Sequence, residues 1–234
     1  MKTRQEIKQL SKLAMAGQRG TSILILFVFM LVAGAGSSIG WFIGLIPVIG
    51  WLISLAITCI IMVLQVNVER SFIKIYCEET TGVGEMFSEL QVNFFRKLGG
   101  MWWMTLFVWL WSLLLIIPGI IKWIAYSMTP FILAECPNVT AKDALKISMR
   151  MTKGHKATLF VMMLSFIGWY LLSSLTFGIL GIFYVNPYFY TTYAGYYVEL
   201  RDNAIATGAV SKAELEGAGS IPEPLETPEA PETE

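Results

Sequence analysis

The sequence predicts an all-α integral membrane protein: a polytopic bundle of about six transmembrane helices in three hairpins, with amphipathic helices on the cytoplasmic side. The first observation is composition, since 55% of the 234 residues are hydrophobic and only 15% are charged, against about 25% in an average soluble domain. The second is a set of long charge-free stretches: Thr21–Gly36, Gly44–Val66, Leu98–Ile121 and Thr158–Val198. A helix needs about 20 apolar residues to cross the hydrocarbon core, so these stretches predict membrane spans.

The third observation is a layout that occurs three times, in units of about 2–69, 70–138 and 139–204. Each unit begins with a basic amphipathic segment, and two apolar runs separated by a Gly/Pro break follow. A fixed period of this kind favours an internal repeat, although any six spans joined by alternating loops produce the same rhythm. In either case we expect residues 1–204 to form one transmembrane helical domain.

The first unit begins with a helix start signal. Thr3 and Glu6 fit a capping box, in which each side chain binds a free backbone N–H group at the start of a helix. We therefore expect an amphipathic helix over 3–16, ended by Gly17. A basic region before an apolar run also resembles a signal peptide. Because the basic region is long and helical in its own right, we expect the first span to be retained. The unit's two spans are predicted over 21–39 and 46–68.

The second unit contains four apolar residues spaced four apart, which predict one amphipathic helix over 85–97: Met86, Leu90, Phe94 and Leu98. Spans over 99–117 and 120–134 follow, separated by a break at Pro118. Pro130 lies inside the shorter span and should kink it, because proline removes a backbone donor. If Pro118 only kinks one long helix, the chain has five spans and its C-terminus faces outward.

The third unit repeats these signals. Thr140 and Asp143 predict the start of an amphipathic helix over 140–153, and Gly154 predicts its end. Two further spans are expected over 157–177 and 181–200. Pro187 lies near the start of the last span.

Topology follows from the distribution of basic residues. Lysines and arginines are concentrated before the first, third and fifth predicted spans, whereas the breaks within the hairpins carry only Lys122. Translocation of loops rich in Lys and Arg is disfavoured. We therefore expect a multi-pass protein of a bacterial plasma membrane, with both termini in the cytoplasm.

The C-terminal region has a different composition. From Glu214 onward the chain contains seven Glu and no basic residue, with frequent proline. Such a sequence buries too little apolar surface to offset its ordering entropy. We expect residues 205–234 to form a disordered acidic tail, and one hypothesis is that this tail shields the basic helices.

Reactive groups are sparse. The chain has one histidine, His155, and three widely separated cysteines, which gives no spacing typical of a zinc site or a disulfide framework. The predicted spans contain no Asp or Glu, which argues against a proton-driven carrier. We predict no catalytic residue, no metal, no cofactor, no nucleic-acid partner and no enzymatic activity.

The basic amphipathic helices are the clearest functional feature. A helix with an apolar stripe and a cationic face lies in the inner interface and contacts anionic lipid. The alternative is that these helices pack under the bundle as structural collars. The candidate contacts for anionic lipid at the inner leaflet, or for a partner protein, are Lys142, Lys146, Arg150, Lys153, His155 and Lys156.

Two functions therefore remain open. The first is a non-enzymatic protein that organises the membrane by binding lipid, a partner membrane protein or a second copy of itself. The alternative is a small-molecule permease or channel, because transporters use broken helices to free backbone groups for ligands. The candidate break positions are Pro118, Pro130 and Pro187.

Several short stretches together point to one family: Tyr126–Pro130, Ala134–Pro137, Ala144–Lys146, Gly154–Lys156, Leu164–Trp169, Pro187–Tyr188 and Glu199–Leu200, with Met1–Ile7 and Leu113–Gly119. Over about residues 1–204 the chain resembles a family of uncharacterised multi-pass membrane proteins of Gram-positive bacteria, classed as a domain of unknown function. That family is distantly similar to the membrane region of some glycerophosphodiester phosphodiesterases. The resemblance implies a six-helix membrane fold and supplies no catalytic residues.

Overall fold

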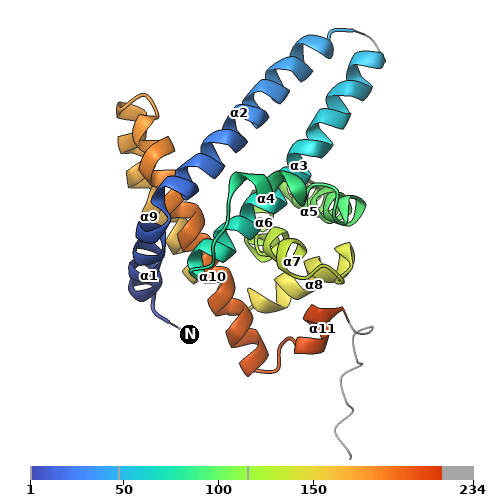
Figure 1. Cartoon of the computed structure of the whole chain (residues 1–234). Helices are drawn as coiled ribbons and strands as arrows, with labels where there is room; N and C mark the ends of the chain where they lie inside the picture. The colour runs from blue at the N-terminus through green and yellow to red at the C-terminus, as the bar shows by residue number, and fades with distance from the viewer. Residues whose placement is uncertain (1, 47, 115, 218–234) are drawn as a thin grey trace, which may run out of the picture.

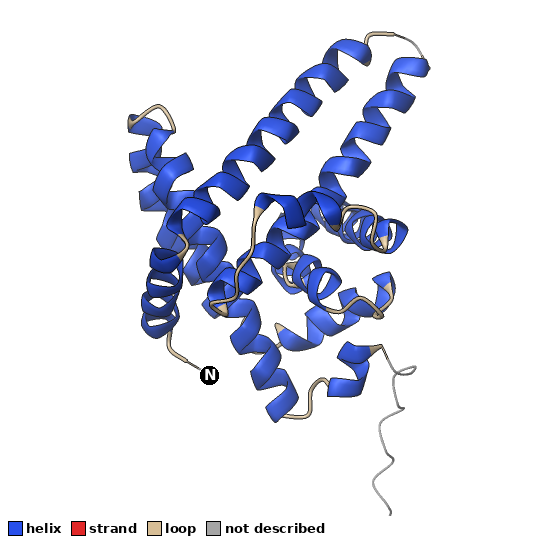
Figure 2. Ribbon diagram, viewed as in Figure 1, coloured by secondary structure: helices blue, strands red, loops and turns tan. Residues whose placement is uncertain are grey.

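The computed structural model describes residues 2–46, 48–114 and 116–217, and its regular elements within these ranges are all helical (Figures 1 and 2). The all-α prediction is confirmed for this part of the chain. The elements are α1 (Arg4–Gly17), α2 (Arg19–Ile43), α3 (Ile49–Tyr76), α4 (Val83–Ser88), α5 (Phe94–Leu114), α6 (Ile116–Tyr126), α7 (Thr129–Glu135), α8 (Ala141–Met151), α9 (Lys156–Leu175), the π-helix η1 (Gly181–Val185), α10 (Asn186–Ala206) and α11 (Lys212–Glu216).

Three helical hairpins project from a common base. α2 packs against α3, α5 against α6, and α9 against η1, which continues into α10. In Figure 1 the α2–α3 hairpin extends toward the upper right and the α9 hairpin toward the upper left, while α7, α8 and α11 lie in the lower half. Large apolar side chains are exposed at the ends of all three hairpins, including Trp51 at 73%, Ile117 at 72% and Phe177 at 97%.

Four helical segments in the described ranges are long and apolar enough to cross a membrane: Arg19–Ile43, Ile49–Tyr76, Ile117–Glu135 and Lys156–Leu175. Three of these segments are largely exposed along their apolar windows, whereas two thirds of the Ile117–Glu135 window is buried inside the protein. Because water would not solvate such apolar surfaces, these helices indicate a membrane protein.

The core lies in the base rather than in the hairpins. It is built from the second half of α3, together with α7, α8 and α10. Phe131 of α7 stacks on Tyr197 of α10, with ring centroids 5.2 Å apart, and both side chains are fully buried. The base can therefore hold a site in a fixed geometry, while the hairpins expose apolar side chains.

The predicted helix starts in the first and third units are confirmed. Thr3 and Glu6 form the reciprocal capping box that starts α1. The Thr140 hydroxyl accepts a hydrogen bond from the Asp143 backbone N–H at 3.2 Å and starts α8. Gly154 follows α8 with a φ of +86°, a left-handed conformation that glycine adopts without a steric penalty.

The single amphipathic helix predicted over 85–97 is wrong. α4 ends at Ser88, and a turn leads to Asn93, whose φ of 53° breaks the helical path. The Asn93 side chain donates a hydrogen bond to the carbonyl of Pro137 at 3.2 Å, which holds this conformation. Phe94 then starts α5. The four-residue spacing that predicted one helix therefore spans two helices and a turn.

The span predicted over 120–134 lies within the candidate membrane-crossing segment Ile117–Glu135, but the helix is interrupted inside it. α6 ends at Tyr126, and α7 starts at Thr129 as a separate helix that is buried from Thr129 to Ala134. Pro130 lies in the first turn of α7, where its missing N–H needs no partner, so it does not kink a helix interior. Pro118 lies in the first turn of α6, and Pro187 lies in the first turn of α10.

The predicted tail begins too early. α10 continues to Ala206, and Ser211 with Glu214 forms a capping box that starts α11. Leu215 of α11 is buried against the base. Residues 205–217 are therefore ordered, because a buried leucine and a cap stabilise them. The remainder of the predicted tail, residues 218–234, lies outside the described residues.

Candidate functional site

Helix α8 positions the basic residues that the sequence singles out. Its apolar face is buried against the base, and that face includes Ala144, Leu145 and Ile147. Two hydroxyls fix its orientation, since Ser148 and Thr152 both donate hydrogen bonds to the carbonyl of Ala125, at 2.8 and 3.3 Å. The opposite face presents a stripe at helical spacing, formed by Lys142, Lys146 and Arg150.

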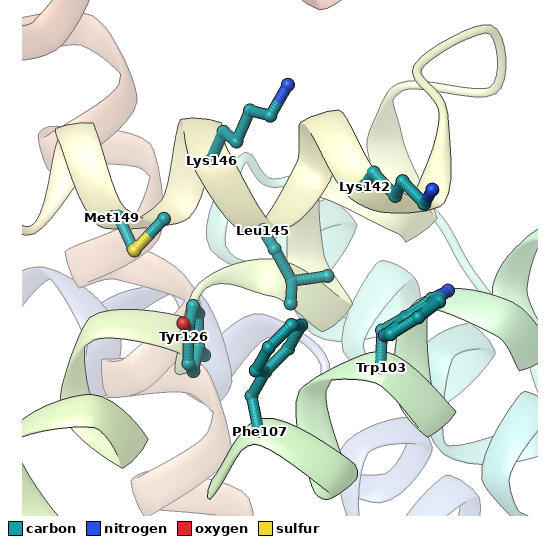
Figure 3. Close-up of a pocket in the computed structure, with 7 residues that line it drawn as sticks. All are labelled: Trp103, Phe107, Tyr126, Lys142, Leu145, Lys146 and Met149. Carbon is teal, nitrogen blue, oxygen red and sulfur yellow. The ribbon is translucent and has the colours of Figure 1, made fainter. Parts of the chain in front are cut away.

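A groove lies where α8 crosses the α5–α6 hairpin (Figure 3). Its volume is about 330 Å³, and it is lined by Trp103, Phe107, Tyr126, Lys142, Leu145, Lys146 and Met149. We call it the α5–α8 groove. Its walls are aromatic and aliphatic except for the two lysines, so it suits an apolar ligand with an anionic end.

Lys142 lies at one edge of the α5–α8 groove. Its ammonium is 5.6 Å from the centroid of the Trp103 ring, a distance at which the ring face attracts a cation. In Figure 3 the Lys142 side chain lies above Trp103, and the Leu145 side chain points toward Phe107. A ligand in the groove would therefore meet an apolar floor and a cation at its edge.

Lys146 lines the same groove with its stem, while its amine points away from the aromatic floor (Figure 3). The ammonium lies 3.3 Å from an Asp143 carboxylate oxygen, and both side chains are well exposed. The Thr140 hydroxyl, which donates a hydrogen bond to Asp143, and then Lys146 lower the pKa of the Asp143 carboxyl. Lys146 is free to leave this exposed pair, because such pairs are worth little.

The other four predicted contacts do not reach the α5–α8 groove. Arg150 forms an ion pair with Glu214 of α11 at 3.0 Å. His155 Nε2 lies 3.3 Å from the Asn203 side-chain nitrogen of α10, and Lys153 and Lys156 lie with it at the junction of α8 and α9. The structure therefore brings Lys142 and Lys146 to one site and separates them from the rest of the set.

The wall of the groove on α5 continues into an exposed apolar surface. Trp103 is 39% exposed, and Leu106, Leu110 and Leu113 follow at helical spacing with 48, 52 and 70% exposure. A chain of methylene groups in the groove could therefore continue along this exposed surface of α5. The structure thus connects a cationic edge to an exposed apolar face of α5.

Helix α1, the first of the three predicted amphipathic helices, packs differently. Lys8 donates a hydrogen bond to the Ser165 hydroxyl at 2.6 Å, and its amine lies 4.6 Å from the Phe166 ring centroid. Lys12 lies 5.4 Å from the Tyr188 ring centroid. Burial lowers the pKa of Lys8. The sequence left two roles open for the amphipathic helices, lipid contact and structural collar. α1 fits the structural collar, because its lysines contact α9 and α10.

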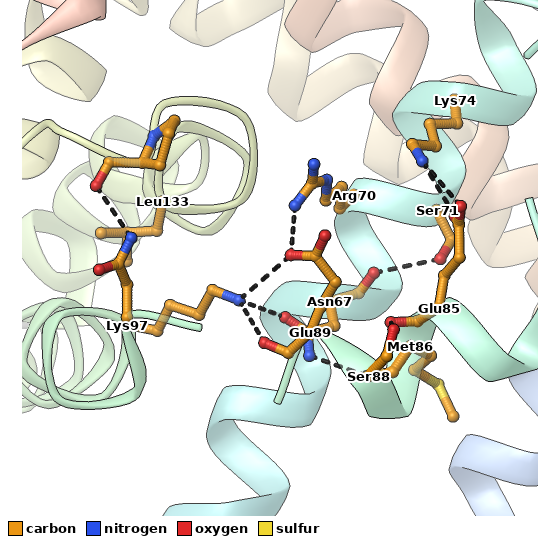
Figure 4. Close-up of polar contacts among 12 residues, drawn as sticks. Asn67, Arg70, Ser71, Lys74, Glu85, Met86, Ser88, Glu89, Lys97 and Leu133 are labelled. Atoms are coloured by element: carbon orange, nitrogen blue, oxygen red, sulfur yellow. Dashed lines mark hydrogen bonds and ion pairs between the residues drawn. The ribbon is translucent and has the colours of Figure 1, made fainter. Parts of the chain in front are cut away.

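A buried polar cluster joins α3, α4 and α5 (Figure 4). The Lys97 amine is buried, and it donates to the Asn67 side-chain oxygen at 2.7 Å and to the Glu89 carbonyl at 3.0 Å. Arg70 forms an ion pair with the Glu89 carboxylate. The sequence placed Lys97 only at the end of the amphipathic helix predicted over 85–97. The one sequence feature that could have indicated burial of Lys97 is its position at the start of a long apolar run.

Glu69 is a second group that the sequence reasoning missed. It lies on α3, one residue beyond the predicted end of the second span, and it is buried. One of its carboxylate oxygens has no hydrogen-bond partner among the described residues. Because α3 continues to Tyr76, the candidate span Ile49–Tyr76 does contain an acid. The span predicted over 46–68 itself contains no Asp or Glu, and this acid lies just beyond its predicted end.

In the ranges 2–46, 48–114 and 116–217, no group of three or more His, Cys, Asp or Glu side chains is placed to hold a metal ion. Cys59, Cys77 and Cys136 are free thiols. The polar and cationic contacts of the base include those of the α5–α8 groove and of the cluster around Lys97.

Residues 100–204 match a family described as a protein of unknown function (DUF975). This stretch runs from α5 to α10 and includes every residue that lines the α5–α8 groove. No curated protein and no solved structure matches the chain. This match agrees with the predicted resemblance to a domain of unknown function. The occurrence in Gram-positive bacteria and the distant similarity to glycerophosphodiester phosphodiesterases stay predictions.

Proposed function

We propose that this chain is a non-enzymatic membrane protein that binds anionic phospholipid at the inner leaflet through the α5–α8 groove. The acyl chain would lie on Phe107 and Leu145, and the headgroup would meet Lys142 and Lys146. The observation that carries this proposal is the cationic edge of an otherwise apolar groove that continues into the exposed face of α5.

Charge supports an anionic ligand over a neutral one. Both lysines are exposed side chains of α8, and each basic group near an anionic surface contributes about 1 kcal/mol. The apolar lining adds the transfer of acyl-chain surface, about 25 cal/mol for each Å² buried. The two contributions together favour a molecule that has both parts.

The proposal includes a topology. Six crossings would be made by α2, α3, α5, α6 with α7, α9, and η1 with α10, so that the base and both termini face the cytoplasm of a bacterial plasma membrane. Support comes from charge, because residues 20–68 and 157–198 carry no Asp, Glu, Lys or Arg. The basic residues of α1, of the start of α5 and of α8 lie at the opposite ends of the hairpins, and loops rich in Lys and Arg tend to stay in the cytoplasm. Helix α8 would then lie at the inner interface.

Native mass spectrometry of the full chain tests the lipid proposal. Protein released from nanodiscs that contain equal amounts of phosphatidylglycerol and phosphatidylcholine should retain phosphatidylglycerol preferentially. The Lys142→Ala/Lys146→Ala variant should lose that preference, and Met149→Trp, which fills the groove, should reduce retention of both lipids. Lys212→Ala serves as the control, because it removes an exposed lysine of α11 outside the groove.

The possible results distinguish binding in the groove from a response to total charge. Loss of the phosphatidylglycerol preference in the double variant, with the Lys212→Ala variant unchanged, supports the proposal. Equal loss in both variants would mean that lipid responds only to total charge, and an unchanged preference in the double variant would remove the groove from consideration.

A second candidate function is a permease, and one specific observation favours it. Glu69 is a buried acid on a candidate span, and intramembrane carboxyl groups are typical of proton pathways. Proteoliposomes with a trapped pH-sensitive dye test this function. A proton flux that Glu69→Gln abolishes would support the permease, and a flux that this variant leaves unchanged would exclude Glu69 from it.

A further inference from the structure

One end of the basic stripe on α8 is already covered by an acidic segment of the same chain. Glu214 of α11 pairs with Arg150 at 3.0 Å, and the Glu214 side chain is only 9% exposed. Leu215 is buried beside it. The two lysines at the other end of the stripe, Lys142 and Lys146, are exposed. The stripe is thus half occupied by the beginning of the acidic region.

The chain leaves α11 toward the open end of the stripe. The Asn138 side chain, two residues before the cap of α8, donates a hydrogen bond to the carbonyl of Glu216 at 3.1 Å. Gly217 lies so close to Asn138 that a Cβ on it would be 2.4 Å from the Asn138 Cβ. Its φ of +76° also favours glycine. The path from Glu214 to Gly217 therefore runs from the C-terminal end of α8 toward its N-terminal end.

The residues that follow complement the open end in charge. Residues 218–234 contain five Glu and no Lys or Arg. Seventeen residues can extend over roughly 56 Å, whereas α8, with 11 residues, is about 16 Å long. The segment can therefore reach Lys142 and Lys146 from Gly217 without strain, and several of its carboxylates can be in range at once.

We propose that residues 218–234 bind across Lys142 and Lys146 and compete with anionic lipid for the edge of the α5–α8 groove. The docking of the segment stands on the charges and on the path of α11, and its competition with lipid rests on the proposed function. An attached segment of this length has an effective local concentration in the millimolar range, so weak exposed ion pairs suffice. High salt should weaken the docking, because exposed charges are screened.

Zero-length carbodiimide coupling of the full chain, in lipid-free detergent at low ionic strength, tests the docking. The reagent activates a carboxylate, and the lysine amine displaces the activating group to form an amide, so only groups in contact are joined. Peptide mass spectrometry should find Lys142 or Lys146 joined to glutamates of 218–234. The variant with all five of those glutamates changed to Gln should lack these products. Coupling of the wild type through Lys156 instead, or through neither α8 lysine, would overturn the proposal.

The competition is tested with the phosphatidylglycerol retention measurement. The five-Gln variant should retain several-fold more phosphatidylglycerol than the wild type, and the Glu223→Gln/Glu226→Gln variant should lie between them. Glu78→Gln/Glu79→Gln removes two exposed carboxylates elsewhere and should match the wild type. Equal retention in the wild type and the five-Gln variant would overturn the competition.

The two proposals fail in different ways. If Lys142→Ala/Lys146→Ala leaves lipid retention unchanged while the coupling products form, the lipid function fails and the docked segment stands. If the double variant loses lipid but no coupling products form, the lipid function stands and the docking is wrong.

Discussion

At the scale of single residues, Lys97 and Lys142 show how the same side chain serves two purposes. Lys142 is exposed over an aromatic ring, whereas Lys97 is 2% exposed and hydrogen-bonded to two oxygens. A buried lysine of this kind is costly unless its partners compensate for lost hydration. Lys97 therefore stabilises the junction of α3, α4 and α5, and Lys142 is available for a ligand.

Replacement of Lys97 by Met should destabilise the fold. The Asn67 side-chain oxygen and the Glu89 carbonyl would lose a donor in a buried place, which costs about 1–3 kcal/mol. Thermal unfolding in detergent should show a lower melting temperature for Lys97→Met and no change for Lys142→Met. Equal melting temperatures for the two variants would mean that the polar cluster contributes nothing to stability.

The lowered pKa of Asp143 gives a pH dependence with a defined sign. A carboxyl whose pKa is lower in the folded state contributes stability above its unfolded pKa, near 4, and this contribution is lost as the pH falls through the folded value. The wild type should therefore melt above Asp143→Asn at pH 7, with a small gap of under about 1 kcal/mol because the group is exposed. The gap should close at acidic pH. A gap that persists below pH 3 would contradict this role.

Sequence patterns identified some of these residues and missed others for physical reasons. Lys142 and Lys146 were found because the basic stripe of α8 has helical spacing. Lys97 and Glu69 were missed because burial depends on which helices pack together, and that information lies far away in the sequence. Arg150 was grouped with the free cations because its partner, Glu214, is 64 residues away.

At the scale of elements, local signals predicted helix starts well and helix ends less well. Thr3 and Thr140 cap the helices they were expected to cap, because capping depends on neighbouring residues. The separation of α4 from α5 depends on the contact between Asn93 and Pro137, 44 residues apart. The separation of α6 from α7 depends on the burial of α7 in the base. Tertiary contacts therefore override the periodicity at these two places.

The close crossing of α5 and α7 makes a prediction about two neighbouring glycines. A Cβ on Gly100 would stand 2.4 Å from the Leu133 Cδ1, and Leu133 is fully buried. A Cβ on Gly99 would meet only Ala141 Cβ, at 3.8 Å. Gly100→Ala should therefore destabilise the protein by about 1–3 kcal/mol.

Gly99→Ala is the matched control and should be neutral or slightly stabilising, because alanine favours a helix over glycine by up to about 1 kcal/mol. Denaturation of both variants in the same detergent measures the difference. Equal stability of the two variants would contradict the close approach of α5 to Leu133.

At the scale of the whole molecule, the polar base and the apolar hairpins divide the chain into a part for water and a part for lipid. The sequence predicted three hairpins because charge-free runs alternate with basic segments. It could not predict that α7 and most of α10 lie in the core, since their composition resembles that of a lipid-facing helix. The lipid proposal, and with it the competition between lipid and the docked segment, depends on one arrangement, in which the three hairpin ends lie on one side of the membrane and α8 on the other.

Cysteine accessibility in intact cells tests that arrangement most directly. In a background with Cys59, Cys77 and Cys136 replaced, single cysteines at 46, 117 and 177 report the three hairpin ends, and those at 153 and 216 report the base. An impermeant reagent should label the first three positions in intact cells and the last two only after permeabilisation. If position 153 or 216 is labelled in intact cells along with one of the hairpin ends, the base and the hairpin ends are on the same side of the membrane. That result would contradict the account, because α8 would then not lie at the inner leaflet.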